Sequence, residues 1–504
     1  MKKLFALVLM IAICASMIFA GGSPESTATA KEPAQKDTLV VAVATEPTTL
    51  HPATTSLVYD EILLLQIYGN LLRYDADMNI VPDLAESYEV IDDTHIKFKL
   101  RDNLKFSDGT PITATDVAAS LLAIKNSKAA AVKAKWYDHC DIQDDLNFTV
   151  VTSNPSSSVL DGIATKCHIA PAKLLESGHD FNKSPVSSGP YMVKEWAQGQ
   201  AITLVKNPEY NVPGREAKIE NISYRIIPEG VTRTISLEKG EIDFVIDVQA
   251  SDLAELSERK DIVITSAVNC SPAFLCFNTQ DSRLANINLR KAIAAGINRD
   301  NVILIATGGY AKPLTSGFVL GLLGSTEEGA VGYDPEAAKK YLAASGIPAD
   351  QLKFDVVVKE PAFELAMQSA QADLKELGID IQIRTVDSAT YNALSGGNGE
   401  YDLMMARSNY AELTGAMGGI TSKNAYNQSR LNDSWIDEMV AKAGVTTDTA
   451  AREKILHDII KYVNENCFRS GLYQMVNVRA YNANLQGFES NMLGYDCFNM
   501  LSWK

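Results

Sequence analysis

The feature that most constrains the fold is a regular exchange of helix and strand patterns in the C-terminal half. Asp334-Pro335 is typical of a helix start, with an N-cap residue followed by a first-turn proline, and Gly346 of its end. Strands separated by helices require crossover connections and predict a largely parallel sheet. The same alternation predicts, in order, a strand at 352–358, a helix at 361–377, a strand at 379–383, a helix at 388–394 and a strand at 401–406.

The N-terminal half contains strand and helix signals of its own. Residues 39–43 form a continuous apolar run suited to a buried strand, and residues 95–101 alternate as a half-buried strand does. Thr113 is followed three residues later by Asp116 and then by an apolar face, which predicts a capped helix. With 504 residues the chain is too long for one core, so we expect two or three lobes.

Residues 1–20 have the pattern of a secretory signal peptide. Lys2 and Lys3 precede an uncharged apolar run, and Ala20 offers a small residue for cleavage. Two alternatives stay open, an uncleaved anchor and a lipid anchor at Cys14, because the residues before that cysteine loosely resemble a lipobox. Residues 21–37 have little to bury and predict a flexible tether. No later stretch is long and apolar enough to span a bilayer, so we expect an exported, soluble mature chain.

Composition and motifs exclude several functions. The formal net charge of −16 argues against nucleic-acid binding. We find no metalloprotease, nucleophile-elbow, P-loop or dinucleotide-binding motif and no histidine pair with metal-ligand spacing, so we expect no enzyme, no cofactor and no metal site. The sequence around His139-Cys140 is interpreted as a loop with a partly buried thiol. Cys467 with Cys497 and Cys140 with Cys167 are candidate disulfides, and free thiols are an equal alternative.

A series of segments in a fixed order resembles a known family. The chain is similar throughout residues 38–500 to the family 5 extracellular solute-binding proteins of ABC importers, which include dipeptide, oligopeptide and nickel-complex receptors. The segments that carry the resemblance are 83–90, 98–101, 105–117, 187–191, 207–210, 240–244, 277–279, 289–293, 297–299, 333–339, 374–379 and 401–403.

The resemblance implies an α/β periplasmic-binding-protein fold with two lobes, an extra inserted domain and a cleft between the lobes. It places the hinge near 277–281 and again near 472–476. The implied division is residues 38–72, 188–279 and 476–504 for lobe I, 73–187 for the inserted domain and 280–475 for lobe II.

The resemblance further implies a monomeric, periplasmic or cell-envelope receptor that captures a peptide or similar small solute. The receptor would deliver this solute to the membrane subunits of an ABC importer, and ATP hydrolysis on another chain would drive transport. Other interpretations are a ligand-presenting sensor, a chaperone-like binding protein, a nickel-chelate receptor or a secreted hydrolase. The hydrolase interpretation has no motif to support it.

The expected pocket departs from the family's peptide-binding pattern. The acid that relatives place just after the strand at 401–406 is missing, although Glu412 can substitute for it, and no arginine lies near 359–361. Arg407 is a candidate partner for a ligand carboxylate, or else for a surface or inter-lobe acid. The predicted ligand-binding residues are Thr45, Glu46, Leu50, Ser188, Gly189, Pro190, Phe277, Asn278, Thr279, Arg407, Asn409 and Tyr410.

Overall fold

The computed structural model describes residues 36–54, 57–397 and 399–504. The predicted signal peptide, Cys14 and all but the last two residues of the predicted tether lie outside the described residues. Within the described residues, no helix has the length and apolar character needed to cross a bilayer. The six cysteines beyond Cys14 are free thiols in the described chain.

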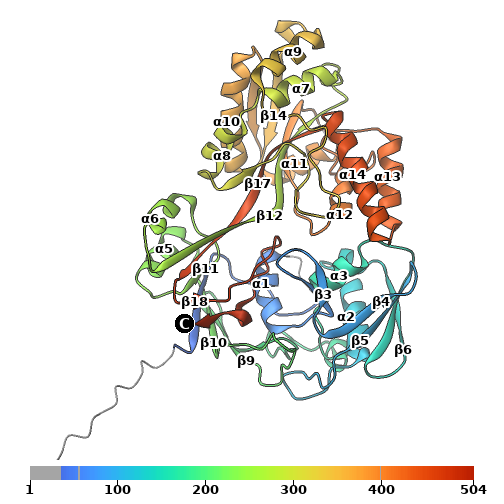
Figure 1. The fold of residues 1–504 in the computed structure, drawn as a ribbon, viewed down its shortest axis with the longest axis vertical. Coiled ribbons are helices and arrows are strands. Elements are labelled where there is room, and N and C mark those ends of the chain that lie inside the picture. Colours follow the sequence, from blue (N-terminus) through green and yellow to red (C-terminus); the bar gives the residue numbers. More distant parts are fainter. Residues whose placement is uncertain (1–35, 55–56, 398) are drawn as a thin grey trace, which may run out of the picture. The chain divides into compact units, whose positions relative to one another are not determined.

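One large mixed sheet runs through the protein and is built around two long antiparallel strands (Figure 1). These are β12 (Ile262–Phe277) and β17 (Arg469–Asn482), whose pairing shifts register between Val268 and Phe274. The strand order is β15-β14-β16-β12-β17-β11-β1-β10-β9-β8, and the short β13 also pairs with β17. The protein therefore has two α/β lobes, one at each end of β12 and β17.

Lobe I forms around the first predicted strand. Residues 39–43 form β1 (Thr38–Val43), as predicted, and β1 is almost completely buried because both faces of the sheet are covered. The remaining elements are α1 (Val58–Ile67), β8 (Tyr191–Ala197), β9 (Ala201–Lys206), β10 (Asn221–Ile226), α5 (Gly230–Glu238), β11 (Phe244–Val245), α6 (Leu253–Ser257), β18 (Leu485–Gln486) and β19 (Ser502–Trp503).

A separate four-stranded antiparallel sheet with its own core forms the inserted domain. The prediction for residues 95–101 is confirmed, since β5 (His95–Leu100) buries Ile96, Phe98 and Leu100 and leaves Lys97 exposed. Thr113 and Asp116 form the predicted capping box at the start of α2 (Ala114–Lys125). The other elements are β2 (Leu72–Tyr74), β3 (Ile80–Pro82), β4 (Ala85–Val90), β6 (Tyr137–Ile142), β7 (Asn147–Thr152), α3 (Val159–Lys166) and α4 (Ala172–Ser177).

Lobe II contains the helix–strand alternation that the sequence predicts. The Asp334 side chain accepts hydrogen bonds from two backbone amides at the start of α9 (Pro335–Ser345), and Gly346 ends the helix at φ +65°. The other elements are α7 (Ile287–Gly296), α8 (Arg299–Thr307), β13 (Ala311–Pro313), β14 (Lys353–Val358), α10 (Pro361–Glu376), β15 (Asp380–Thr385), α11 (Ser388–Ser395), β16 (Leu403–Arg407), α12 (Leu413–Met417), α13 (Ser434–Val445) and α14 (Thr449–Glu465).

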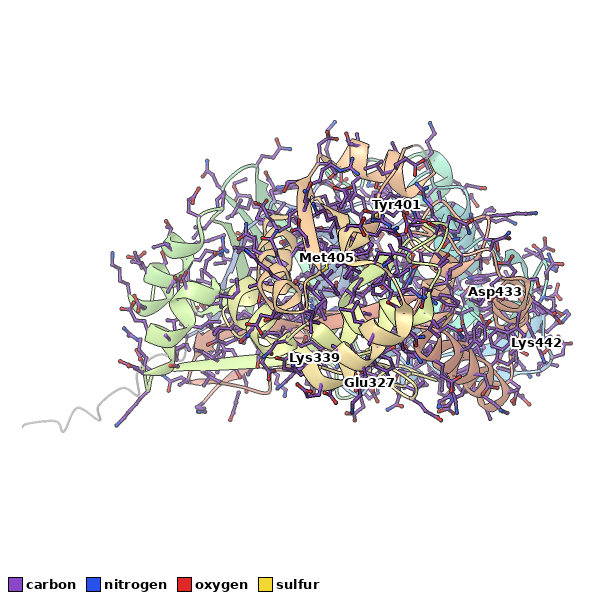
Figure 2. The ribbon with its side chains drawn as sticks, turned by 90° about the horizontal axis from the view of Figure 1, so that it is seen from above. Glu327, Lys339, Tyr401, Met405, Asp433 and Lys442 are labelled. Atoms are coloured by element: carbon purple, nitrogen blue, oxygen red, sulfur yellow. The ribbon has the colours of Figure 1, made fainter. Side chains whose placement is uncertain are left out.

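The prediction of a largely parallel sheet holds for only part of lobe II. β14 pairs in parallel with β15 and with β16, which are the strands that helices connect. β12 and β17 are antiparallel to their neighbours because one enters the lobe and the other leaves it. Met405 lies in this sheet, whereas Asp433 and Lys442 lie on the flank that α13 occupies (Figure 2).

Candidate ligand-binding cleft

The strand directions make the carboxyl ends of the parallel strands in the two lobes face each other. β1, β10 and β11 are parallel, and β12 runs in their direction because both β11 and β12 are antiparallel to β17. The carboxyl ends in lobe I therefore point toward lobe II. β16 is antiparallel to β12, so its carboxyl end points toward lobe I. In open α/β sheets, ligands bind outside the carboxyl ends of the strands. The cleft therefore lies between these two edges.

Polar side chains occupy both edges. On lobe I, Thr45 is exposed just after β1, and Asp247 follows β11 and accepts a hydrogen bond from the Tyr59 hydroxyl at 3.3 Å. On lobe II, Arg407 ends β16, and its Nε lies 3.4 Å from Glu360 Oε1. The Arg407 side chain is 45% exposed, so it remains accessible to a ligand despite this ion pair.

A cavity of about 430 Å³ lies between the inserted domain and lobe II. Most of its wall is apolar or aromatic, and both sides contribute leucines. The inserted-domain wall includes Tyr74, Met78, Ile80, Tyr88, Leu160 and Asp161, and the lobe II wall includes Leu322, Leu323, Ala411, Glu412, Leu413, Arg452 and Leu456. Small-molecule sites have this size range and this mixture of apolar walls with a few polar groups.

Two carboxylates from opposite sides of the cleft line this cavity. Asp161 accepts a hydrogen bond from the Tyr74 hydroxyl at 3.0 Å, and its partner Lys133 is 3.7 Å away. Glu412 caps α12, where its carboxylate accepts hydrogen bonds from the backbone amides of Thr414 and Gly415. Burial raises the pKa of Glu412, and the negative charge of Asp161 raises it further, against the effect of these hydrogen bonds. This electrostatic environment favours a positively charged group.

Arg452 is the cationic side chain in the same wall. Its Nη1 donates to the carbonyls of Thr446 and Thr447 at 3.1 and 3.4 Å. The guanidinium thus has acceptors from its own helix end. The acidic groups that line the cavity are Asp161, Glu412 and the exposed Asp77.

Six predicted site residues are buried, and five of them lie in the packing of the lobes. The Ser188 hydroxyl donates to the Ile169 carbonyl at 2.6 Å, and a Cβ on Gly189 would lie 2.8 Å from the backbone of Ile67. Asn278 donates to the carbonyl of Tyr401 at 2.8 Å. These five are Leu50, Ser188, Gly189, Phe277 and Asn278, and the sixth buried residue is Pro190.

The other predicted residues occupy several different places. Thr279 donates to the Ser429 carbonyl at the end of β12 distant from lobe I, and Pro190 is buried and lines a cavity of about 50 Å³ between lobe I and the inserted domain. The Glu46 carboxylate accepts hydrogen bonds from Trp196 and Gly199. Thr45 and Arg407 lie at the facing strand edges, and Asn409 and Tyr410 are exposed between Arg407 and Glu412. The cavity wall begins directly after these residues, with Ala411, Glu412 and Leu413.

The sequence analysis missed the contribution of the inserted domain to the cleft. Tyr74 and Asp161 lie 87 residues apart and meet through one hydrogen bond. No short motif marks either residue. An acidic residue in the first turn of a helix is the one local signal that Asp161 offers.

In the part of the chain that the structure describes, no group of three or more His, Cys, Asp or Glu side chains is arranged to hold a metal ion. His139 lies in strand β6, not in the predicted loop, and pairs with the exposed carboxylates of Asp138 and Asp141.

The sequence and the fold are similar to those of bacterial solute-binding proteins. Residues 79–426 match the model described as bacterial extracellular solute-binding proteins, family 5. The chain is 27% identical to the probable D,D-dipeptide-binding periplasmic protein DdpA of Escherichia coli K12, over 92% of this chain and 94% of that protein. It is 25% identical to the glutathione-binding protein GsiB of Escherichia coli O157:H7, over 90% and 92%. The substrate-binding protein CtaP of an ABC transporter of Listeria monocytogenes has the same fold, with a TM-score of 0.84, 21% identity and coverage of 93% and 99%.

Proposed function

Because this chain belongs to the family 5 bacterial extracellular solute-binding proteins, we propose that it captures a short peptide between its lobes and delivers it to an ABC importer. The observation that carries this proposal is the inter-lobe cavity of about 430 Å³, to which the inserted domain contributes Asp161 and lobe II contributes Glu412.

The cavity favours a ligand with a free ammonium group. An ammonium near Asp161 and Glu412 would form charge-assisted hydrogen bonds with carboxylates from both sides of the cleft. It would also remove the unfavourable interaction between these two buried charges. The leucine and tyrosine side chains of the wall would then contact the ligand's apolar side chains. Short peptides combine these features, and two relatives are named for a dipeptide and for glutathione.

Arg407 is the proposed partner for the ligand's carboxylate. It lies on the lobe II edge of the cleft, and its pairing with Glu360 at 3.4 Å is long for a direct hydrogen bond. A ligand carboxylate can offer the guanidinium a two-point interaction that Glu360 does not make in the present geometry.

Export and membrane partners complete the proposal. The relative DdpA is named a periplasmic protein, and the relative GsiB is named a glutathione-binding protein. Residues 1–20 of this chain have the pattern of a signal peptide. We infer that the mature chain acts outside the cytoplasm and presents its ligand to the membrane subunits of the importer. Ligand binding would shift the lobes from an open to a closed population.

Retention of peptides from a defined mixture tests the proposal. The protein is incubated with a tryptic digest of casein, either untreated or acetylated to block its amines, and bound peptides are identified by native mass spectrometry. We expect retention of short peptides from the untreated digest alone, and strongly reduced retention by Asp161→Asn or Glu412→Gln. Asp350→Asn is the matched control, because Asp350 is exposed and distant from the cavity wall. Equal retention of acetylated peptides would refute the role of the ammonium, and no retention of either digest would refute peptide binding.

A further inference from the structure

Lobe II touches the inserted domain at a place separate from β12 and β17. The loop between α13 and α14 carries two hydrogen bonds to the inserted domain. The backbone amide of Ser157 donates to the carbonyl of Gly444 at 2.9 Å, and the hydroxyl of Thr447 donates to the carboxylate of Asp93. We call these two interactions, between residues 444–447 and residues 93 and 157, the latch contact.

The loop is held in shape by its own helices. Arg452 on α14 donates to the carbonyls of Thr446 and Thr447, and Asp448 caps α14 by accepting from the backbone amide of Ala451 at 2.7 Å. The Thr446 hydroxyl donates to the Lys442 carbonyl within α13. The loop therefore needs no rearrangement to meet the inserted domain, and the ordering cost of the contact is small. Lys442 lies on the flank of lobe II that carries this loop (Figure 2).

The latch contact lies at one end of the proposed ligand cavity. Ser157, Leu160, Thr449 and Arg452 line both the cavity of about 430 Å³ and a second, smaller one of about 40 Å³. Asp92, Asp93 and Thr447 line the smaller cavity and not the larger one. The four shared residues separate the two cavities, with Ser157 and Leu160 on the inserted domain and the other two on lobe II. The latch contact joins the two domains at this boundary.

We propose that the latch contact holds the cleft closed at this end, in the absence of ligand as well as in its presence, and thereby limits the length of the ligand. The limit on ligand length rests on the proposed function; the closure of the cleft does not. The latch contact is weak, because a hydrogen bond adds little net free energy when both of its partners can bind water instead. It biases the lobes toward closure and still permits opening.

Removing the side-chain half of the contact tests the closure. Thr447→Val deletes the hydroxyl that reaches Asp93, and Thr446→Val is the matched control, because that neighbouring hydroxyl bonds only within its own helix end. Fluorophores at the exposed positions of Lys128 in the inserted domain and Glu438 on α13 report the separation by single-molecule energy transfer in the ligand-free mature protein. We expect Thr447→Val to shift the closed-to-open ratio toward open by about two- to ten-fold, the net contribution of one hydrogen bond. We expect Thr446→Val to match the wild type. Identical distributions for both variants and the wild type would refute the latch.

The length limit has a separate readout. With the untreated casein digest, we expect Thr447→Val to retain longer peptides than the wild type and Thr446→Val to retain the same lengths. An unchanged length distribution together with a shifted closed-to-open ratio would refute the length limit and support closure. If none of the three proteins retains peptide, the proposed function fails, while the energy-transfer result still decides whether the latch exists.

Discussion

Glu61 on α1 makes a buried ion-pair cluster whose removal we expect to weaken the fold strongly. Its carboxylate lies 2.6 Å from Lys166 Nζ and 3.0 Å from His168 Nε2, and Glu61 is only 1% exposed. Removing one partner of a buried pair costs about 3–5 kcal/mol because the remaining charge stays desolvated. Glu61→Gln should lower the free energy of unfolding by about 3 kcal/mol, the lower end of this range, because the amide oxygen can still accept a hydrogen bond from Lys166.

The loss of stability caused by Glu61→Gln should depend on pH in a defined direction. Burial alone would raise the pKa of Glu61, but His168 and Lys166 outweigh burial and lower it below its ordinary value. A carboxyl whose pKa is lower in the folded than in the unfolded state stabilises the fold fully above its unfolded pKa, about 4.3. This stabilisation disappears as the pH falls through the folded pKa. The difference in the free energy of unfolding between the wild type and Glu61→Gln should therefore be large at pH 7 and should shrink below about pH 4.3.

Urea unfolding followed by circular dichroism at pH 7.0 and at pH 3.5 measures this difference. Glu86→Gln is the matched control, because Glu86 lies at the same distance of 2.6 Å from Lys99 but both side chains are more than two-fifths exposed. Exposed pairs contribute little, so the control should unfold at nearly the wild-type urea concentration. A loss below about 1 kcal/mol for Glu61→Gln at pH 7, or a loss of equal size at both pH values, would refute the argument from burial.

Three further predictions follow from single contacts. Thr113→Ala should lower the free energy of unfolding of the inserted domain by about 1 kcal/mol in urea titrations, because it removes the capping box. Gly189→Ala should lower the thermal midpoint because the new Cβ would lie 2.8 Å from the backbone of Ile67. Gly444→Ala should instead raise it slightly, because Gly444 lies in α13, no atom lies within 4 Å of the new Cβ, and alanine favours a helix over glycine. Because burial raises the pKa of Glu412, retention of amine-bearing casein peptides should fall with decreasing pH and should begin to fall above the ordinary glutamate pKa of about 4.3. Retention that does not change between pH 7 and about pH 4.3 would contradict an ionised Glu412 in the site.

Local signals in the sequence predicted the elements that depend on neighbouring residues. The helix start at Asp334 and the capping box at Thr113 involve contacts over two or three residues, so their chemistry is visible in the sequence itself. β12 and β17 were not predicted as long strands. They pair with each other across about 200 residues, and no local pattern records such a partner.

The site was less predictable for the same reason. Ser188 and Gly189 stand out in the sequence because their small size is needed where two segments approach closely, and this requirement buries them. Glu412 was recognised as a substitute acid from its position after the strand now seen as β16. Asp161 could not be paired with it, since the two carboxylates line one cavity only when the inserted domain and lobe II are assembled.

The buried cluster at Glu61 connects these observations. Glu61 belongs to α1 of lobe I, whereas Lys166 ends α3, the helix that also carries Asp161. The ion pair therefore fixes α3 to lobe I, so Asp161 is held in place on one wall of the cleft. The register of the two long strands, in contrast, shifts between the lobes, at Val268 to Phe274. If the chain works as proposed, closure would bring the Glu412 wall toward an Asp161 wall that is already positioned, and this pre-organisation would lower the ordering cost of ligand binding.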